Sequence, residues 1–131
     1  MKPSDWEEIL VDLESRDVDT CVAAVERLHL EAGVEDVPKL LLLLRDGRDF
    51  FIREATAWPL VGLVGPSVLR ELFAAYQLGF DEGHDNDGFT SALLELQALY
   101  PVETKRALEQ LIRSEIGVLR ENAQWLLEFF E

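Results

Sequence analysis

The sequence has few cysteines, few histidines and few basic residues, and each shortage excludes a kind of protein or site. Its single cysteine, Cys21, excludes an internal disulfide and suits a reducing compartment. A zinc site would need this cysteine together with both histidines, His29 and His84, which lie far apart along the chain. We therefore expect no metal site.

Long apolar runs are also missing. The leucine run at residues 40–44 is far shorter than the roughly 20 apolar residues that a membrane-spanning helix needs. The start, Met1-Lys2-Pro3-Ser4-Asp5, is followed by acidic residues rather than by the long apolar run of a signal peptide. The expected location is therefore the cytoplasm.

Basic residues are strongly outnumbered. The chain has 12 Lys and Arg residues against 26 Asp and Glu residues, which gives a formal net charge of −14. An acidic surface repels nucleic acids and anionic membranes, so we expect neither as a partner. The charge favours a basic protein instead, although the alternative that the acid only keeps the protein soluble stays open.

The acidic residues are unevenly distributed. Residues 1–36 hold eleven acidic and three basic residues, a net charge of −8, and residues 80–100 hold five acidic residues and no base, a net charge of −5. Residues 37–79 hold four acidic and five basic residues, a net charge of +1. Negative potential should therefore concentrate at the N-terminal region and around the polar segment 81–87.

Helical periodicity is the clearest pattern that is present. Apolar residues recur at spacings of three and four, and residues typical of helix ends separate the periodic segments. The predicted helices cover residues 5–15, 17–33, 37–45, 49–61, 67–78, 88–99, 101–114 and 117–130. The helix at 37–45 is apolar all round, so we expect it to be buried on more than one face. The sequence predicts an all-α fold of about eight helices in a single domain, residues 1–131, with no strand.

A short pattern occurs twice in the chain. Arg53-Glu54 and, five positions after the arginine, Trp58 recur as Arg120-Glu121 and Trp125. The offset is 67 residues, about two periods of a two-helix repeat of roughly 33 residues. We therefore expect repeated helical hairpins, with both tryptophans packed between helices.

The first copy of this pattern carries further residues at defined positions. They are an aspartate, an aliphatic–Arg pair, a small residue, an aliphatic residue and a glycine: Asp49, Ile52–Arg53, Ala55, Leu60 and Gly62 or Gly65. This arrangement resembles the short HEAT repeat of phycobilisome-lyase-like proteins, except that Pro59 should kink the helix. The resemblance implies an α-solenoid of about four HEAT-like helical hairpins, a right-handed superhelix. It also implies that Arg53 bonds to an aspartate of a neighbouring unit, for which Asp17, Asp19 or Asp49 are candidates.

The most polar segment, residues 80–89, has the sequence FDEGHDNDGF. It does not match a calcium loop: with Gly88 as the sixth position, Gly83 stands where the first aspartate belongs and Leu94 where the final glutamate belongs. Two interpretations remain, a solvated loop that caps the next helix and a contact loop for a partner.

Catalytic motifs are not found. The sequence has no serine nucleophile elbow and no phosphate-binding glycine loop of the usual spacing. Cys21 lies in an apolar stretch with Asp17, Asp19 and Glu26 nearby, whereas a reactive thiol needs an electropositive setting. We expect a non-enzymatic protein without a cofactor.

These observations favour a protein-binding module with a basic protein as its partner. In HEAT-type solenoids the second helix of each pair lines the concave face, which by this register means the helices at 5–15, 37–45, 67–78 and 102–114. The candidate protein-binding residues are acids of these helices and of the polar segment, with one tyrosine: Glu7, Glu8, Asp12, Glu71, Tyr76, Asp81, Glu82, Asp85 and Asp87.

The charge leads to a sharper hypothesis. A small and very acidic domain suits an immunity or antitoxin-like inhibitor of a basic toxin such as a nuclease, because it would cover the surface meant for phosphates. The family resemblance implies an alternative, a phycobilisome-lyase-like chromophore or enzyme-maturation factor. HEAT-like DNA glycosylases are a third class, but they require a basic groove. The apolar residues Trp125, Phe129 and Phe130 of the last helix leave a homodimer open as a further alternative.

Overall fold

The computed structural model describes residues 1–47 and 49–130, and no strand occurs among them. The α-helices are Pro3–Leu13 (α1), Val18–Glu31 (α2), Val37–Asp46 (α3), Phe50–Val64 (α4), Leu69–Asp81 (α5), Asp87–Leu99 (α6), Pro101–Leu111 (α7) and Gly117–Leu127 (α8). Short 3₁₀ helices, Val34–Asp36 (η1) and Gly65–Val68 (η2), precede α3 and α5. The predicted all-α class is confirmed, and the predicted helix ends differ from these by a few residues.

Local side chains explain where several helices begin. Asp17 and Asp49 each accept a hydrogen bond from the backbone N–H three positions later, at 3.2 and 2.9 Å, so a first-turn donor that the helix itself leaves unpaired finds a partner. Pro3 and Pro101 occupy the first turns of α1 and α7, where proline costs no helical hydrogen bond. Pro59 lies inside α4, which nevertheless continues to Val64.

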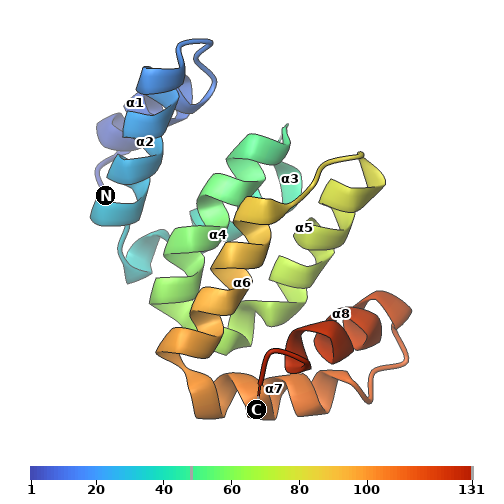
Figure 1. Cartoon of the computed structure of the whole chain (residues 1–131). Helices are drawn as coiled ribbons and strands as arrows, with labels where there is room; N and C mark the ends of the chain where they lie inside the picture. The colour runs from blue at the N-terminus through green and yellow to red at the C-terminus, as the bar shows by residue number, and fades with distance from the viewer. Residues whose placement is uncertain (48, 131) are drawn as a thin grey trace.

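The helices up to α6 form two layers (Figure 1). In one layer α4 packs between α2 and α6, and in the other α3 packs beside α5. α1 packs along α2, and α3 packs along α4. The last pair, α7 and α8, crosses one end of these layers, where α7 contacts α6 and α8 contacts α5. None of the helices in the described part of the chain is long and apolar enough to cross a membrane.

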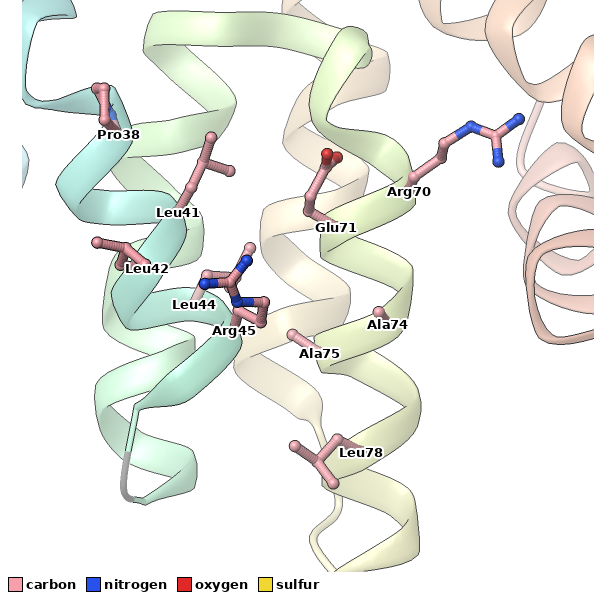
Figure 2. A pocket seen from close by; sticks show the side chains of 10 residues that line it. All are labelled: Pro38, Leu41, Leu42, Leu44, Arg45, Arg70, Glu71, Ala74, Ala75 and Leu78. Atoms are coloured by element: carbon pink, nitrogen blue, oxygen red, sulfur yellow. The ribbon is translucent and has the colours of Figure 1, made fainter.

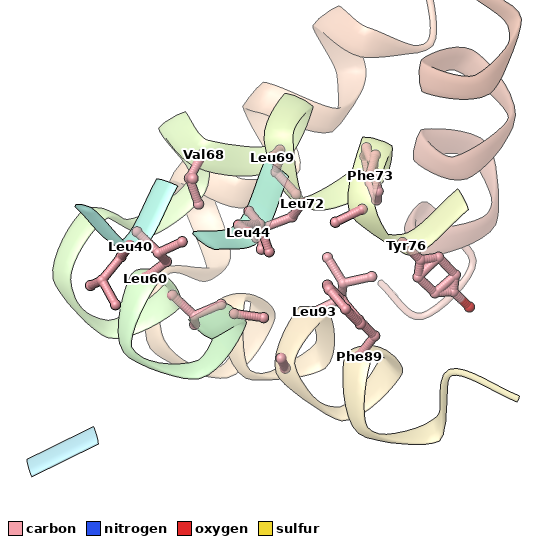
Figure 3. Close-up of a cluster of buried hydrophobic side chains, with 14 of the residues drawn as sticks. Leu40, Leu44, Leu60, Val68, Leu69, Leu72, Phe73, Tyr76, Phe89 and Leu93 are labelled. Atoms are coloured by element: carbon pink, nitrogen blue, oxygen red, sulfur yellow. The ribbon is translucent and has the colours of Figure 1, made fainter. Parts of the chain in front are cut away.

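The apolar core lies between the layers (Figure 3). Its largest fully buried members include Leu40 and Leu44 of α3, Leu60 of α4, Leu69, Leu72 and Phe73 of α5, and Phe89 and Leu93 of α6. These residues come from helices that are far apart in the sequence, so the core fixes how the hairpins stack. Burying side chains of this size stabilises the fold by about 1.5–3 kcal/mol each before the cost of conformational entropy.

The leucine-rich helix α3 is not buried all round. Leu40 and Leu44 are buried, but Leu42 is 51% exposed. The expectation that this apolar helix is buried on more than one face is therefore wrong for the face that carries Leu42. The reason is that α3 packs on α4 and α5 with one side, which leaves its opposite side open.

Candidate protein-binding surfaces

The open side of α3 forms one wall of a groove, and α5 forms the other wall (Figure 2). The groove has a volume of about 500 Å³. Its lining is mostly aliphatic and comes from both helices: Pro38, Leu41, Leu42, Leu44, Ala74, Ala75 and Leu78, with the charged residues Arg45, Arg70 and Glu71. This groove is the largest described hollow of the protein's surface, and it lies between two of the helices that the sequence assigns to the concave face.

The groove follows from small residues on α5 that lie opposite the leucines of α3. Leu72 and Phe73 of α5 are fully buried, and the two residues that follow them, Ala74 and Ala75, line the groove. The small alanine side chains leave space beside Leu42 that a leucine would fill. Leu42 and Leu78 consequently remain 51% and 36% exposed.

The charges of the groove nearly cancel. Arg45 lies in front of the groove and forms an ion pair with its neighbour Asp46 at 3.1 Å, in which both side chains are well exposed. Glu71 lies above the groove, and Arg70 points away from α3 (Figure 2). Exposed pairs of this kind contribute only about 0–1 kcal/mol, so they leave the apolar lining as the main feature.

The loop between α5 and α6 carries a second, acidic surface. Glu82 forms an ion pair and hydrogen bond with Arg53 of α4, whose side chain is nearly fully buried. Arg53 also donates to the backbone carbonyl of Gly47 at 3.1 Å. The expected partners Asp17, Asp19 and Asp49 are therefore wrong: the acid lies directly after α5, later in the chain, and not among these earlier residues.

Asn86 holds this loop in place, a role that the sequence analysis did not assign to it. The residue is fully buried, has a left-handed backbone with φ of 61°, and donates its amide to the Tyr76 carbonyl at 2.7 Å. Its side chain lies so close to Gly79 that a Cβ there would collide with it. The available signal was the residue type, since asparagine tolerates this backbone conformation better than most residues.

The acids near the start of α6 have little neutralising charge around them. Asp85 accepts a hydrogen bond from the N–H of Asp87 at 3.1 Å, as the capping interpretation of the loop requires. The Glu54 carboxylate lies directly against Gly88 at the start of α6. Burial, followed by repulsion from Asp85 and Asp87, raises the pKa of Glu54 above its ordinary value, and His84 opposes this only in part. The contribution of Asp85 and Asp87, which comes after that of burial, reflects the negative charge at the start of α6.

The N-terminal acids form a separate surface. Glu7 and Glu8 of α1 are exposed, and Asp12 is half-buried. Glu8 pairs with Arg27 of α2 at 2.9 Å, and Arg27 also pairs with Glu31 at 2.7 Å. This surface and the α5–α6 loop lie on opposite sides of α3 and α4 in Figure 1, so the structure does not bring the two groups of candidate acids together.

The remaining candidates divide between the groove and the core. Glu71 is exposed at the groove, and Asp81 is exposed and accepts a hydrogen bond from Gln77 at 3.1 Å. Tyr76 is only 4% exposed: its ring packs on Trp125 with 5.3 Å between centroids, and its hydroxyl lies 3.2 Å from that of Thr90. Tyr76 is therefore a core residue, which leaves little of its side chain for a partner to contact.

The residues that could carry chemistry are dispersed. The Cys21 thiol is half-buried and lies 2.8 Å from the Ser15 carbonyl oxygen, to which it donates. His29 is exposed on α2, and His84 stacks on Phe50 with 4.2 Å between ring centroids. Within residues 1–47 and 49–130, no three histidine, cysteine or carboxylate side chains are grouped so that they could hold a metal ion.

Comparison with known proteins adds no relative. No family model matches the chain, and neither a curated protein nor a solved structure matches it. The groove, the acidic loop and the net charge are therefore the features of the protein that bear on its function.

Proposed function

We propose that this chain is a non-enzymatic protein-binding module, and that its partner is a basic protein which docks an apolar segment into the α3–α5 groove. The observation that carries this proposal is the junction of two surfaces. The groove wall ends at Leu78, and α5 ends soon after it at Asp81, from where the loop with Asp85 leads to Asp87 at the start of α6.

The two surfaces suit one partner segment. A groove lined by leucine and alanine side chains can receive the apolar face of a helix, as in helix-in-groove recognition. Basic residues beyond the end of that face would meet the acids of the loop, where Asp85 and Asp87 already repel Glu54. The apolar contact would supply most of the affinity, and the charges would supply orientation and the rate of association.

The proposal includes a HEAT-like solenoid as the scaffold. Its support is a hydrogen bond that the repeated sequence pattern makes twice. Arg53 donates to the carbonyl of Gly47 at 3.1 Å, and Arg120 donates to the carbonyl of Ser114 at 3.3 Å, in each case six residues earlier. The stacking of α4 between α2 and α6 supports the same architecture.

Within this class, an inhibitor of a basic toxin such as a nuclease is the most specific proposal. The net charge of −14 supports it, because a nuclease presents a basic surface to its phosphate substrate and an acidic inhibitor can occupy that surface. A measurement of the inhibition of purified basic nucleases at two salt concentrations would test this narrower proposal.

A second candidate, a chromophore or enzyme-maturation factor, draws its support from the groove alone. A volume of about 500 Å³ and an aliphatic lining fall within the range of small-molecule sites. Mixing the protein with a linear tetrapyrrole should then change the visible absorption spectrum. A spectrum equal to the sum of its parts would remove this candidate.

The main test is capture of the partner from a lysate of the source cells by matched variants. Leu42→Asp together with Leu78→Asp should reduce capture by on the order of tenfold or more, because it charges the groove wall. The control Leu99→Asp alters an equally exposed leucine on α6, outside the groove, and should capture normally.

The charge is tested in the same experiment. Asp85→Asn with Asp87→Asn should weaken capture by a few-fold at low salt and less at high salt, because salt screens the attraction. The control Glu103→Gln with Glu109→Gln removes the same number of exposed acids from α7. Equal capture by all variants would show that the groove and the loop are not the binding surface.

A further inference from the structure

A second pocket opens on the other layer of the protein, between α2 and α4. It has a volume of about 360 Å³ and is lined by Val25, Glu26, His29 and Leu30 of α2 and by Trp58 of α4. The walls are largely apolar, and Leu30 is 81% exposed. The volume lies within the range of about 300–1,000 Å³ that is usual for sites of small organic groups.

Trp58 distinguishes this pocket from a gap between helices. Its counterpart in the repeated pattern, Trp125, is covered by Tyr76 at 5.3 Å and by Phe129 at 5.5 Å between ring centroids. Trp58 packs partly on the core, but it stays partly exposed and lines the pocket. Trp125 is half-buried and packs on the core as well, so what sets Trp58 apart is that it lines the pocket.

The charge of the pocket is negative. Glu26 is exposed at the pocket, and no lysine or arginine lines it. The adjacent base, Arg27, is turned towards α1, where it pairs with Glu8, and it also pairs with Glu31. The pocket lies on a helix of the region 1–36, whose net charge is −8 from eleven acidic and three basic residues.

We propose that this pocket binds an arginine side chain of the basic partner. The methylene groups of the arginine would lie against Val25 and Leu30, and its guanidinium would stack on the Trp58 indole and meet the Glu26 carboxylate. A planar guanidinium suits this combination better than an ammonium group, because it both stacks on aromatic rings and pairs with carboxylates. The identity of the occupant rests on the proposed function, since it is the basic partner that supplies the arginine.

The test uses a probe that needs no partner. N-acetyl-arginine amide is titrated into the ¹⁵N-labelled protein, and the indole N–H resonance of Trp58 is followed, with Trp58→Phe to assign it among the three tryptophans. N-acetyl-citrulline amide is the matched neutral probe, because it has the same shape without the charge. We expect a saturable shift of the Trp58 resonance, with citrulline binding about two- to fivefold more weakly.

A variant pair then separates the pocket from the overall charge. Glu26→Gln should weaken the binding of the arginine probe by about two- to fivefold, whereas Glu103→Gln, at an exposed acid of α7 outside the pocket, should leave it unchanged. Equal affinities for arginine and citrulline, or an unchanged titration in Glu26→Gln, would overturn the proposal and indicate an apolar ligand or none. Because the probe needs no partner, failure to capture a protein would count against the proposed function alone.

Discussion

The two copies of the Arg-Glu and Trp pattern, on α4 and on α8, have the same local geometry and different surroundings. Arg53 and Arg120 make the same hydrogen bond to a carbonyl six residues earlier. Arg53 is 2% exposed and receives the Glu82 carboxylate, whereas Arg120 is half-buried and has no carboxylate partner among the described residues. The hydrogen bond to the carbonyl six residues earlier therefore depends on the local sequence. The Glu82 carboxylate that pairs with Arg53 comes from an element later in the chain.

The largest difference should appear when each arginine is removed. Arg53→Met should lower the free energy of unfolding by about 2–4 kcal/mol, because it removes the hydrogen bonds that a buried side chain makes to the Gly47 carbonyl and to Glu82. Arg120→Met should cost less than about 1 kcal/mol, because its surroundings are partly hydrated. Urea denaturation of both variants measures the two values, and equal losses would show that the surroundings do not matter.

Substitutions in the α5–α6 loop, which positions Glu82, should give the next largest loss of stability. In the described part of the chain, no such loop follows α8. Asn86→Ala should destabilise the protein by about 2–3 kcal/mol, through the lost bond to the Tyr76 carbonyl and the strained left-handed backbone. Asn86→Gly keeps that backbone accessible, so it should lose only about 1–2 kcal/mol. If thermal unfolding showed Asn86→Gly to be less stable than Asn86→Ala, strain of the left-handed backbone would not contribute to the loss in the alanine variant.

The N-termini of α4 and α8 also differ, because only α4 has a side-chain cap, and substitutions there should change the stability by a smaller amount. Asp49 caps α4, while Ile116 stands before α8 and supplies no side-chain cap. Asp49→Ala should cost about 1 kcal/mol, and Ile116→Asp should stabilise α8 by up to about 1 kcal/mol because the residue is exposed. A loss of stability in Ile116→Asp would mean that its side chain contributes more by packing than a cap can contribute.

This contrast also explains which features the sequence could predict. Helix positions depend on local periodicity and on caps such as Asp49, so they are predicted within a few residues. Arg53 and Glu82 lie 29 residues apart in the sequence, and nothing in the local pattern distinguishes Glu82 from the other acids near it. The exposure of Leu42 and the burial of Tyr76 depend in the same way on which neighbouring helix covers each face. The groove could not be predicted because it is a product of that packing.

The glutamates of the two patterns give the smallest expected effect and a test of sign. Burial and the charges of Asp85 and Asp87 raise the pKa of Glu54 in the folded protein, so the folded state holds a proton more tightly than the unfolded state. The stabilisation from Glu54 is therefore present below its ordinary pKa and is lost as the pH rises through the raised value. Glu54→Gln should consequently be more stable than the wild type at pH 7, by less than about 1 kcal/mol, and the difference should disappear in acid. Urea midpoints of Glu54→Gln and the wild type, compared from pH 4 to pH 8, measure this difference, and Glu121→Gln at the exposed counterpart on α8 is the matched control. A Glu54→Gln variant that is less stable than the wild type at neutral pH would show that the carboxylate contributes favourably at the start of α6, which would outweigh its repulsion by the loop acids.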